Sequence, residues 1–190
     1  MKNFKEIKVG EINENTFEMI GKKWMLVTAE KKSGEVNTMT ASWGGLGVLW
    51  RKNVAFIFIR PQRFTKGFVD EAEKFSLTFF DESYRKQLSY LGTASGKDEN
   101  KIEKAKLTVE HENGAPIFKE AETVIICRKL YAQPLEEQFF IDKDSDKECY
   151  PDKDYHVMYV GEIEKVFVRS EERRVGVRIK ITLFYYIKYI

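Results

Sequence analysis

Two short segments of the chain combine residue types that suit a ligand with a polar ring and a phosphate. The first, residues 37–44, alternates polar and apolar side chains like a strand and then ends in small hydroxyl residues, an indole and a glycine. A flat heterocycle with acceptors along its edge needs donors, which strand-edge N–H groups and hydroxyls supply. Glycines allow such a ring to approach closely. The residues predicted to line it are Thr38, Met39, Thr40, Ala41 and Ser42.

The second segment, residues 58–65, is an apolar strand that runs directly into two arginines and a threonine. The planar forks of Arg60 and Arg63 can bind phosphate oxygens bidentately. The Thr65 hydroxyl and the amides at the start of a helix would complete the site. The alternative is a pair of solvated arginines at a strand end. A polar ring followed by a single phosphate predicts a flavin mononucleotide (FMN) site.

Composition narrows the remaining ligand classes. The 190 residues suit one domain, and 32 basic against 30 acidic residues leave a formal charge of +2. Because no basic block dominates, nucleic acid is not an expected partner. The lysine-rich start lacks the apolar region of a secretory signal. The apolar run near the C-terminus is too short and too often interrupted by lysine to cross a bilayer. We therefore expect no secretory signal and no membrane association, while the small number of cysteines favours a reducing, cytoplasmic setting.

The two cysteines, Cys127 and Cys149, form neither a disulfide framework nor a metal-ligand spacing. Cys127 follows an apolar run and is predicted to be a buried small hydrophobe. Cys149 lies in a charged segment and is predicted to be a free thiol. No metal site is expected.

Hydrophobic alternation predicts about six strands, with helices inserted irregularly between them, which favours a mainly β, antiparallel barrel with short peripheral helices. Helices are expected from Thr65 to about residue 75, from Asp81 or Ser83 onward, and over residues 98–105, while residues 142–154 read as a polar surface loop. Trp24 and Trp50 are assigned to the core. No Gly-x-Gly-x-x-Gly follows a strand, and residues 44–47 lack the P-loop lysine, which excludes both nucleotide-binding motifs. The predicted strands are residues 24–29, 36–43, 53–60, 75–80, 122–133 and 155–168.

Three motifs together resemble the flavin reductase-like family, especially its flavoredoxin branch. They are Asn-x-Met-Thr-Ala-Ser-Trp-Gly (37–44), Ile-Arg-Pro-x-Arg-x-Thr (59–65) and a distal His-x-x-x-x-Gly-Glu (156–162). The resemblance covers about residues 10–169. It implies an FMN-binding split β-barrel, usually a homodimer, over residues 1–170. Residues 171–190 are left as an atypical tail, either a terminal strand packed on a partner subunit or an extension foreign to the natural chain.

The resemblance also implies roles for four further residues. Trp43 would form a wall against the flavin ring, the alternative being a core aromatic. Ser95 and Lys101 resemble the loop that closes over the ribityl phosphate, the alternative being a solvated, lysine-rich helix. His156 would lie near the flavin face, where it orients a nicotinamide or donates a proton, and an ordinary pKa near 6.5 suits that role. A purely structural histidine is the alternative.

The predicted function is an oxidoreductase of flavin reductase type, in which electrons pass from NADH, NADPH or a protein donor through FMN to an acceptor. The main alternative is a non-enzymatic FMN carrier of the flavoredoxin kind, which exchanges electrons with redox protein partners. A third hypothesis is a barrel that holds another ligand, such as haem, in the same cleft.

Overall fold

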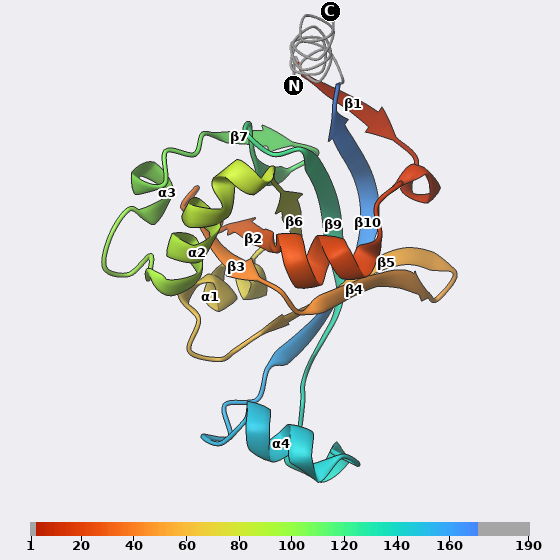
Figure 1. The fold of residues 1–190 in the computed structure, drawn as a ribbon, viewed down its shortest axis with the longest axis vertical. Helices are drawn as coiled ribbons and strands as arrows, with labels where there is room; N and C mark the ends of the chain where they lie inside the picture. Colours follow the sequence, from red (N-terminus) through yellow and green to blue (C-terminus); the bar gives the residue numbers. More distant parts are fainter. Residues whose placement is uncertain (1–2, 171–190) are drawn as a thin grey trace, which may run out of the picture.

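The computed structural model describes residues 3–170, and its centre is an antiparallel β-barrel (Figure 1). Seven strands are hydrogen-bonded in the order β3-β2-β6-β9-β10-β5-β4, β1 pairs with β10, and β7 and β8 form a separate hairpin. The mainly β, antiparallel prediction is confirmed, although the described part of the chain has more strands than predicted. They are β1 (Phe4–Ile7), β2 (Met25–Glu30), β3 (Val36–Ala41), β4 (Gly44–Leu49), β5 (Lys52–Ile59), β6 (Lys74–Phe79), β7 (Val109–Glu112), β8 (Ala115–Phe118), β9 (Thr123–Pro134) and β10 (Val157–Arg169).

Four α-helices and several shorter helical turns connect these strands. The α-helices are α1 (Phe64–Glu71), α2 (Arg85–Thr93), α3 (Lys101–Lys104) and α4 (Lys143–Cys149). The 3-10 turns are η1 (Val9–Glu11), η3 (Glu82–Tyr84) and η4 (Glu137–Phe139), and η2 (Glu18–Lys23) is a short π-helix.

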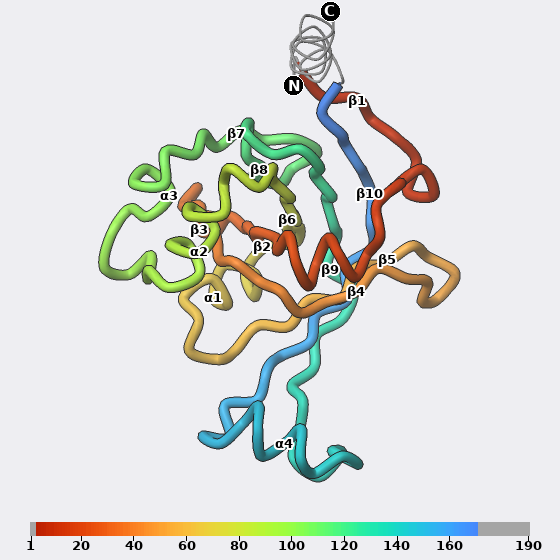
Figure 2. The backbone as a smooth tube through the Cα atoms, viewed as in Figure 1, coloured from red at the N-terminus to blue at the C-terminus, as the bar shows by residue number. Residues whose placement is uncertain are grey.

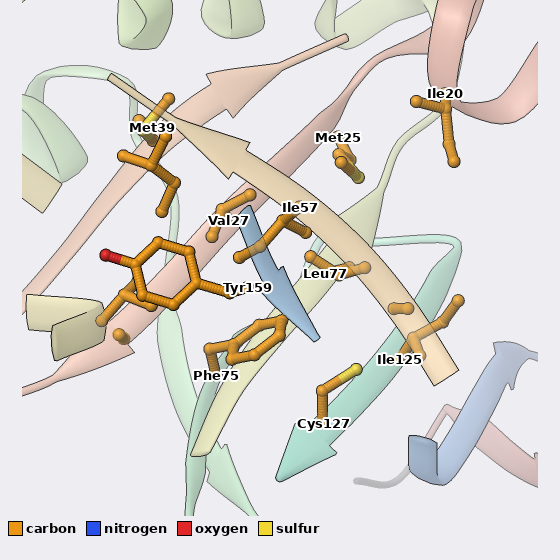
Figure 3. Close-up of a cluster of buried hydrophobic side chains, with 14 of the residues drawn as sticks. Ile20, Met25, Val27, Met39, Ile57, Phe75, Leu77, Ile125, Cys127 and Tyr159 are labelled. Carbon is orange, nitrogen blue, oxygen red and sulfur yellow. The ribbon is translucent and has the colours of Figure 1, made fainter. Parts of the chain in front are cut away.

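Strand alternation divides the buried side chains into two layers. Val27 belongs to the cluster inside the barrel, whereas its neighbour Leu26 belongs to a second cluster outside it. Figure 3 shows the inner cluster, where side chains from β2, β5, β6, β9 and β10 meet around Tyr159 and Phe75. Cys127 lies there, fully buried, which confirms its prediction as a small core hydrophobe, and burial raises the pKa of its thiol.

The barrel is open along one seam, because the two ends of the sheet are β3 and β4. These strands follow each other in the chain, yet each is hydrogen-bonded on one side only, to β2 and β5 respectively. Within residues 3–170, the seam leaves an edge of β3 without a neighbouring strand. A β-barrel that fails to close at one pair of strands is a split barrel, as predicted.

A long arm, defined here as residues 135–156, projects from the barrel between β9 and β10 (Figures 1 and 2). It carries η4 and α4. The prediction of a polar loop over residues 142–154 is therefore wrong in part, because residues 143–149 form α4. The Asp142 side chain accepts a hydrogen bond from the Asp144 amide and caps that helix.

Other differences from the predicted elements arise from long-range pairing. The glycine-rich residues 44–47, considered from the sequence only as a P-loop candidate, belong to strand β4, because β5 pairs with it in register. Helix α1 begins at Phe64 and ends at Glu71, earlier than predicted, because Lys74 already belongs to β6. Trp50 is not in the core. It lies in the β4–β5 turn with φ of 51° and 56% of its surface exposed.

Candidate functional site

The free edge of β3 presents backbone groups rather than hydroxyls. Thr38 is fully buried, with its Oγ1 2.8 Å from Thr28 Oγ1 and 3.1 Å from the Val27 carbonyl oxygen, to which it donates. Thr40 donates to the Leu88 carbonyl of α2 at 2.5 Å. Between them, Met39 packs into the barrel core. The donors predicted from the two threonine hydroxyls are thus already used, because strand alternation turns both toward the outer layer.

The end of β3 leads to a group of accessible side chains at the seam. Ala41 is half-buried, Ser42 is exposed, and Trp43 has 45% of its surface exposed. The Trp43 ring lies 5.0 Å from the ring of His156, measured between centroids. Trp43 is therefore not a core aromatic, and it is placed with the distal histidine. The backbone at Gly44 then runs close to β5, since a Cβ there would lie 2.7 Å from the Phe56 carbonyl oxygen.

Two cations, Arg63 just before α1 and Lys101 at the start of α3, form no ion pair with a carboxylate among residues 3–170. The exposed Arg63 donates from Nη1 to the Gly92 carbonyl at 2.7 Å. The buried Lys101 donates from Nζ to the Leu91 and Ala94 carbonyls at 3.0 and 2.9 Å. Burial, reinforced by the charge of Arg63, lowers the pKa of Lys101 to about 8. Two positive charges held close together in this way favour an anion between them.

Arg60, the other predicted phosphate ligand, is placed differently. It forms an ion pair with Asp154 of the arm, donates to the Cys149 carbonyl at 2.8 Å, and lies 5.2 Å above the ring of Tyr150. Gln62 donates to the same Asp154 carboxylate at 2.6 Å. Because the arm neutralises Arg60, this side chain ties the arm to the barrel and offers less charge to a phosphate than Arg63 does.

Thr65 is buried and linked to β3 through a residue that we did not predict. Asn37 is 4% exposed and donates from Nδ2 to Thr65 Oγ1 at 3.0 Å. The loop after α2 rests on this pair, because a Cβ on Gly96 would lie 2.5 Å from Asn37 Oδ1. Ser95, in the same loop, accepts a hydrogen bond from the Lys97 amide at 3.2 Å. Asn37 opens the first motif, so its place in that motif was a signal in the sequence.

His156 is almost buried, with 8% of its surface exposed, and its Nδ1 lies 2.8 Å from the hydroxyl of Tyr150. Burial lowers the pKa of His156 to about 4, and the positive charge of Arg60 adds to this effect. The ordinary pKa near 6.5 assumed from the sequence is therefore wrong. The imidazole is therefore neutral near pH 7. It can orient a ligand by hydrogen bonding, but the protonated imidazolium that would act as a general acid is scarcely populated.

The predicted residues thus form two adjoining groups, with one turn between them. Arg63, Thr65, Ser95 and Lys101 lie around the start of α1 and the loop after α2, whereas Trp43 and His156 lie with Arg60 at the root of the arm. The Arg63 amide donates to the Arg60 carbonyl at 3.1 Å and so closes the turn that connects them. The charge of Arg63 lowers the pKa values of both Lys101 and His156, which places it within reach of both groups.

A separate cavity lies away from these residues. It has a volume of about 300 Å³ and is found on the arm and the adjoining ends of β9 and β10, where it is lined by Gln133, Pro134, Leu135, Glu136, Phe139, Phe140 and Met158. None of the predicted site residues lines it. Across residues 3–170, no helix is long and apolar enough to cross a membrane, and no group of three or more His, Cys, Asp or Glu side chains could hold a metal ion.

Comparison with solved structures finds the same fold in several proteins. Flavoredoxin from Methanosarcina acetivorans is 25% identical, with a TM-score of 0.60 over 88% of this chain and 76% of that one. Flavoredoxin of Desulfovibrio vulgaris (Miyazaki F) is 20% identical, with a TM-score of 0.60 over 86% and 76%. A flavin reductase with a split barrel domain, described as putative, from Shewanella frigidimarina is 18% identical, with a TM-score of 0.61 over 83% and 74%.

A comparison with curated proteins gave no match. The family model for the flavin reductase like domain matches residues 18–188. This match runs past residue 170, where the resemblance read from the motifs stops. Residues 171–190 lie outside the described part of the chain, so the two readings of the tail stay predictions. The match covers most of the sequence and agrees with the split barrel, and the chain therefore belongs to the flavin reductase like domain family.

Proposed function

We propose that the protein is an FMN-binding oxidoreductase of flavin reductase type, passing electrons from NADH, NADPH or a protein donor through FMN to an acceptor. The observation that carries this proposal is the pair of cations Arg63, just before α1, and Lys101, at the start of α3, which are close enough for the charge of Arg63 to lower the pKa of Lys101 and which form no ion pair with a carboxylate in the described chain. The free edge of β3 lies beside them. An anion binding site next to a row of backbone donors suits a ligand with one phosphate and a polar ring.

The residues at the phosphate end fit FMN. Arg63 and Lys101 would neutralise the phosphate, and the first amides of α1 together with Thr65 would add donors. Ser95 would contribute from the loop after α2, which Gly96 allows to lie directly on Asn37. Arg60 would act from the rim, because Asp154 already pairs with it. Solved structures of the same fold from Shewanella baltica and Thermus thermophilus are described as FMN-binding.

The residues at the ring end fit the isoalloxazine. Backbone groups of Thr38, Met39, Thr40 and Ala41 would serve its polar edge, with the Ser42 hydroxyl at the end of the strand. Trp43 and His156 would bound the face at which a donor approaches. Bound FMN would supply the electron-transfer chemistry. The protein would supply position, a positive potential near the phosphate, and a neutral imidazole that donates a hydrogen bond.

We also propose that the protein works as a homodimer. Large apolar side chains are exposed on the β4–β5 hairpin and on the arm, which both project from the barrel (Figure 1). Such patches mark interaction surfaces more often than monomeric exteriors. A second subunit would also wall the open seam of the barrel. Sedimentation analysis tests this, and a monomer with full FMN affinity would contradict it. The exposed residues are Val48 and Trp50 on the hairpin, Phe139 and Ile141 on the arm, and Tyr131 on β9, whose ring lies 6.1 Å from that of Trp50.

The second candidate function is a non-enzymatic FMN carrier that exchanges electrons with redox proteins. It is favoured by the similarity to two flavoredoxins. Steady-state consumption of NADH and NADPH in the presence of excess free FMN separates the two. Turnover well above that of free flavin supports the reductase. A protein whose bound FMN is reduced by dithionite, yet not by either nucleotide, supports the carrier.

The proposed role of His156 in the reduction of FMN by NADH or NADPH has its own test. His156→Asn should retain bound FMN but slow its reduction by NADH or NADPH, while photoreduction of the flavin stays normal. Stopped-flow reduction of the reconstituted variant measures this. An unchanged reduction rate would remove His156 from the mechanism and favour the carrier.

A further inference from the structure

Tyr150, the residue that follows α4, is a buried side chain that joins the arm to the candidate site. It is 4% exposed, and its hydroxyl lies 2.8 Å from His156 Nδ1. Its ring is 4.9 Å from that of Tyr155 and 5.6 Å from that of Phe140, and Arg60 lies above it. Because aromatic rings and a guanidinium surround it, the hydroxyl is held where it meets the histidine.

The chemistry of the two groups fixes the direction of their hydrogen bond. A phenol O–H is a strong donor, and a neutral imidazole carries one nitrogen that accepts and one that donates. The backbone amide of His156 also interacts with the Tyr150 hydroxyl and, because an amide N–H can only donate, it leaves the hydroxyl proton for His156 Nδ1. If Tyr150 donates, both atoms are satisfied by one bond. The ring proton of His156 must then be on Nε2.

We propose that Tyr150 is a positioning residue that donates to His156 Nδ1, and thereby fixes His156 as the tautomer that carries its proton on Nε2. The Nε2–H, on the far side of the ring from Tyr150, is then the donor that His156 offers to an acceptor atom of a ligand beside Trp43. Only this last step rests on the proposed function.

The charges around His156 support the neutral ring that the proposal requires. Arg60 and Arg63 oppose protonation, Asp154 favours it, and burial outweighs Asp154 and keeps the pKa of His156 low. Asp154 is itself paired with Arg60. Between pH 6 and 8 the ring is therefore neutral, and the hydrogen bond to Tyr150 selects its tautomer.

The sequence makes this tautomer directly measurable, because the chain has two histidines, His111 and His156. Protein labelled with ¹⁵N-histidine, without added flavin, gives two ring systems in long-range ¹H–¹⁵N correlation spectra, and His156→Asn assigns them. At pH 7 the His156 ring should show Nδ1 as a bare acceptor and Nε2 as N–H. A proton on Nδ1 in the wild-type protein would overturn the proposal.

A matched pair of variants tests the part played by Tyr150. Tyr150→Phe removes the donor and should give averaged ¹⁵N shifts, as expected for a mixture of tautomers. Tyr155→Phe removes a neighbouring hydroxyl that donates to Asp146 at 2.7 Å, and should leave the His156 shifts unchanged. A fixed Nε2–H tautomer in a folded Tyr150→Phe protein would overturn the proposal.

Flavin kinetics separate this inference from the proposed function. Tyr150→Phe should bind FMN within about twofold of wild type, yet its reduction by NADH or NADPH should slow about tenfold. If neither the wild-type protein nor Tyr150→Phe binds FMN, the proposed function fails, while the tautomer result still stands. If FMN binds and both proteins are reduced at the same rate, the ligand-directed role of Nε2–H is refuted.

Discussion

Replacement of Arg63 tests the phosphate end of the candidate site with little damage to the fold. Its guanidinium is exposed and donates to one neutral acceptor, the Gly92 carbonyl. Arg63→Ala therefore breaks no ion pair with a described residue, and we expect the free energy of unfolding to change by less than about 1 kcal/mol. A charge-assisted hydrogen bond to phosphate contributes about 1.5–3 kcal/mol. FMN should accordingly bind about ten- to a hundredfold more weakly, or slightly beyond.

The assay is equilibrium titration of flavin fluorescence with FMN and with riboflavin, which lacks the phosphate. Riboflavin should bind wild type and Arg63→Ala almost equally. Arg63→Lys, which keeps the charge but loses the planar fork, should give an intermediate affinity for FMN. Arg51→Ala, at the exposed β4–β5 turn, is the matched control and should bind both flavins as wild type does.

A different pattern would refute this reasoning. If Arg63→Ala weakens FMN and riboflavin alike, Arg63 shapes the turn rather than binding phosphate. If Arg63→Ala binds both FMN and riboflavin with wild-type affinity, the phosphate lies elsewhere.

Three further predictions follow from groups in and around the barrel. FMN affinity should fall as pH rises above about 8, because Lys101, whose pKa is lowered to about 8, then loses its charge; Lys101→Met should abolish this dependence, and riboflavin should not show it. His156 has a pKa of about 4 in the folded protein against about 6.5 unfolded, so only the unfolded chain binds a proton between these values. The free energy of unfolding should therefore fall by about 2–3 kcal/mol as pH drops from 6.5 to 4, and urea titrations should show a smaller fall for His156→Asn. Gly161→Ala should lower that free energy by at least about 2 kcal/mol, since its Cβ would lie 2.6 Å from Phe75 Cζ, whereas Gly67→Ala, with open space in α1, should raise it by about 0.5–1 kcal/mol; the opposite order in thermal melts would refute the packing argument.

The local patterns of the sequence were sufficient where strands alternate and pair with near neighbours. β2 and β5 lie within one residue of their predicted bounds, and β3 begins where predicted but ends two residues earlier. β1 was missed because its partner, β10, lies at the other end of the described chain, and nothing in residues 4–7 indicates that pairing. β4 was missed because its glycines favour turns locally, and only the register with β5 makes it a strand.

The site shows the same limit at the level of single residues. Strand alternation alone predicts that the side chains of Thr38 and Thr40 lie on the opposite face of β3 from Met39. The two hydroxyls and the Met39 side chain therefore cannot all face the same ligand. The role of Arg60 could not be foreseen, because its partner Asp154 lies 94 residues further along the chain. The low pKa of His156 could not be foreseen either. It depends on burial and on the charge of Arg60, and both follow from the packing of the arm against the barrel.

The central proposal is that this barrel holds FMN, and the most direct measurement is the visible absorbance of the purified protein, with identification of the flavin that denaturation releases. We predict a yellow protein with flavin absorbance that releases FMN and not FAD, because we propose that Arg63, Lys101 and Thr65 bind a single phosphate. A colourless preparation should take up FMN on reconstitution. A Soret band, or no affinity for added FMN, would contradict the account.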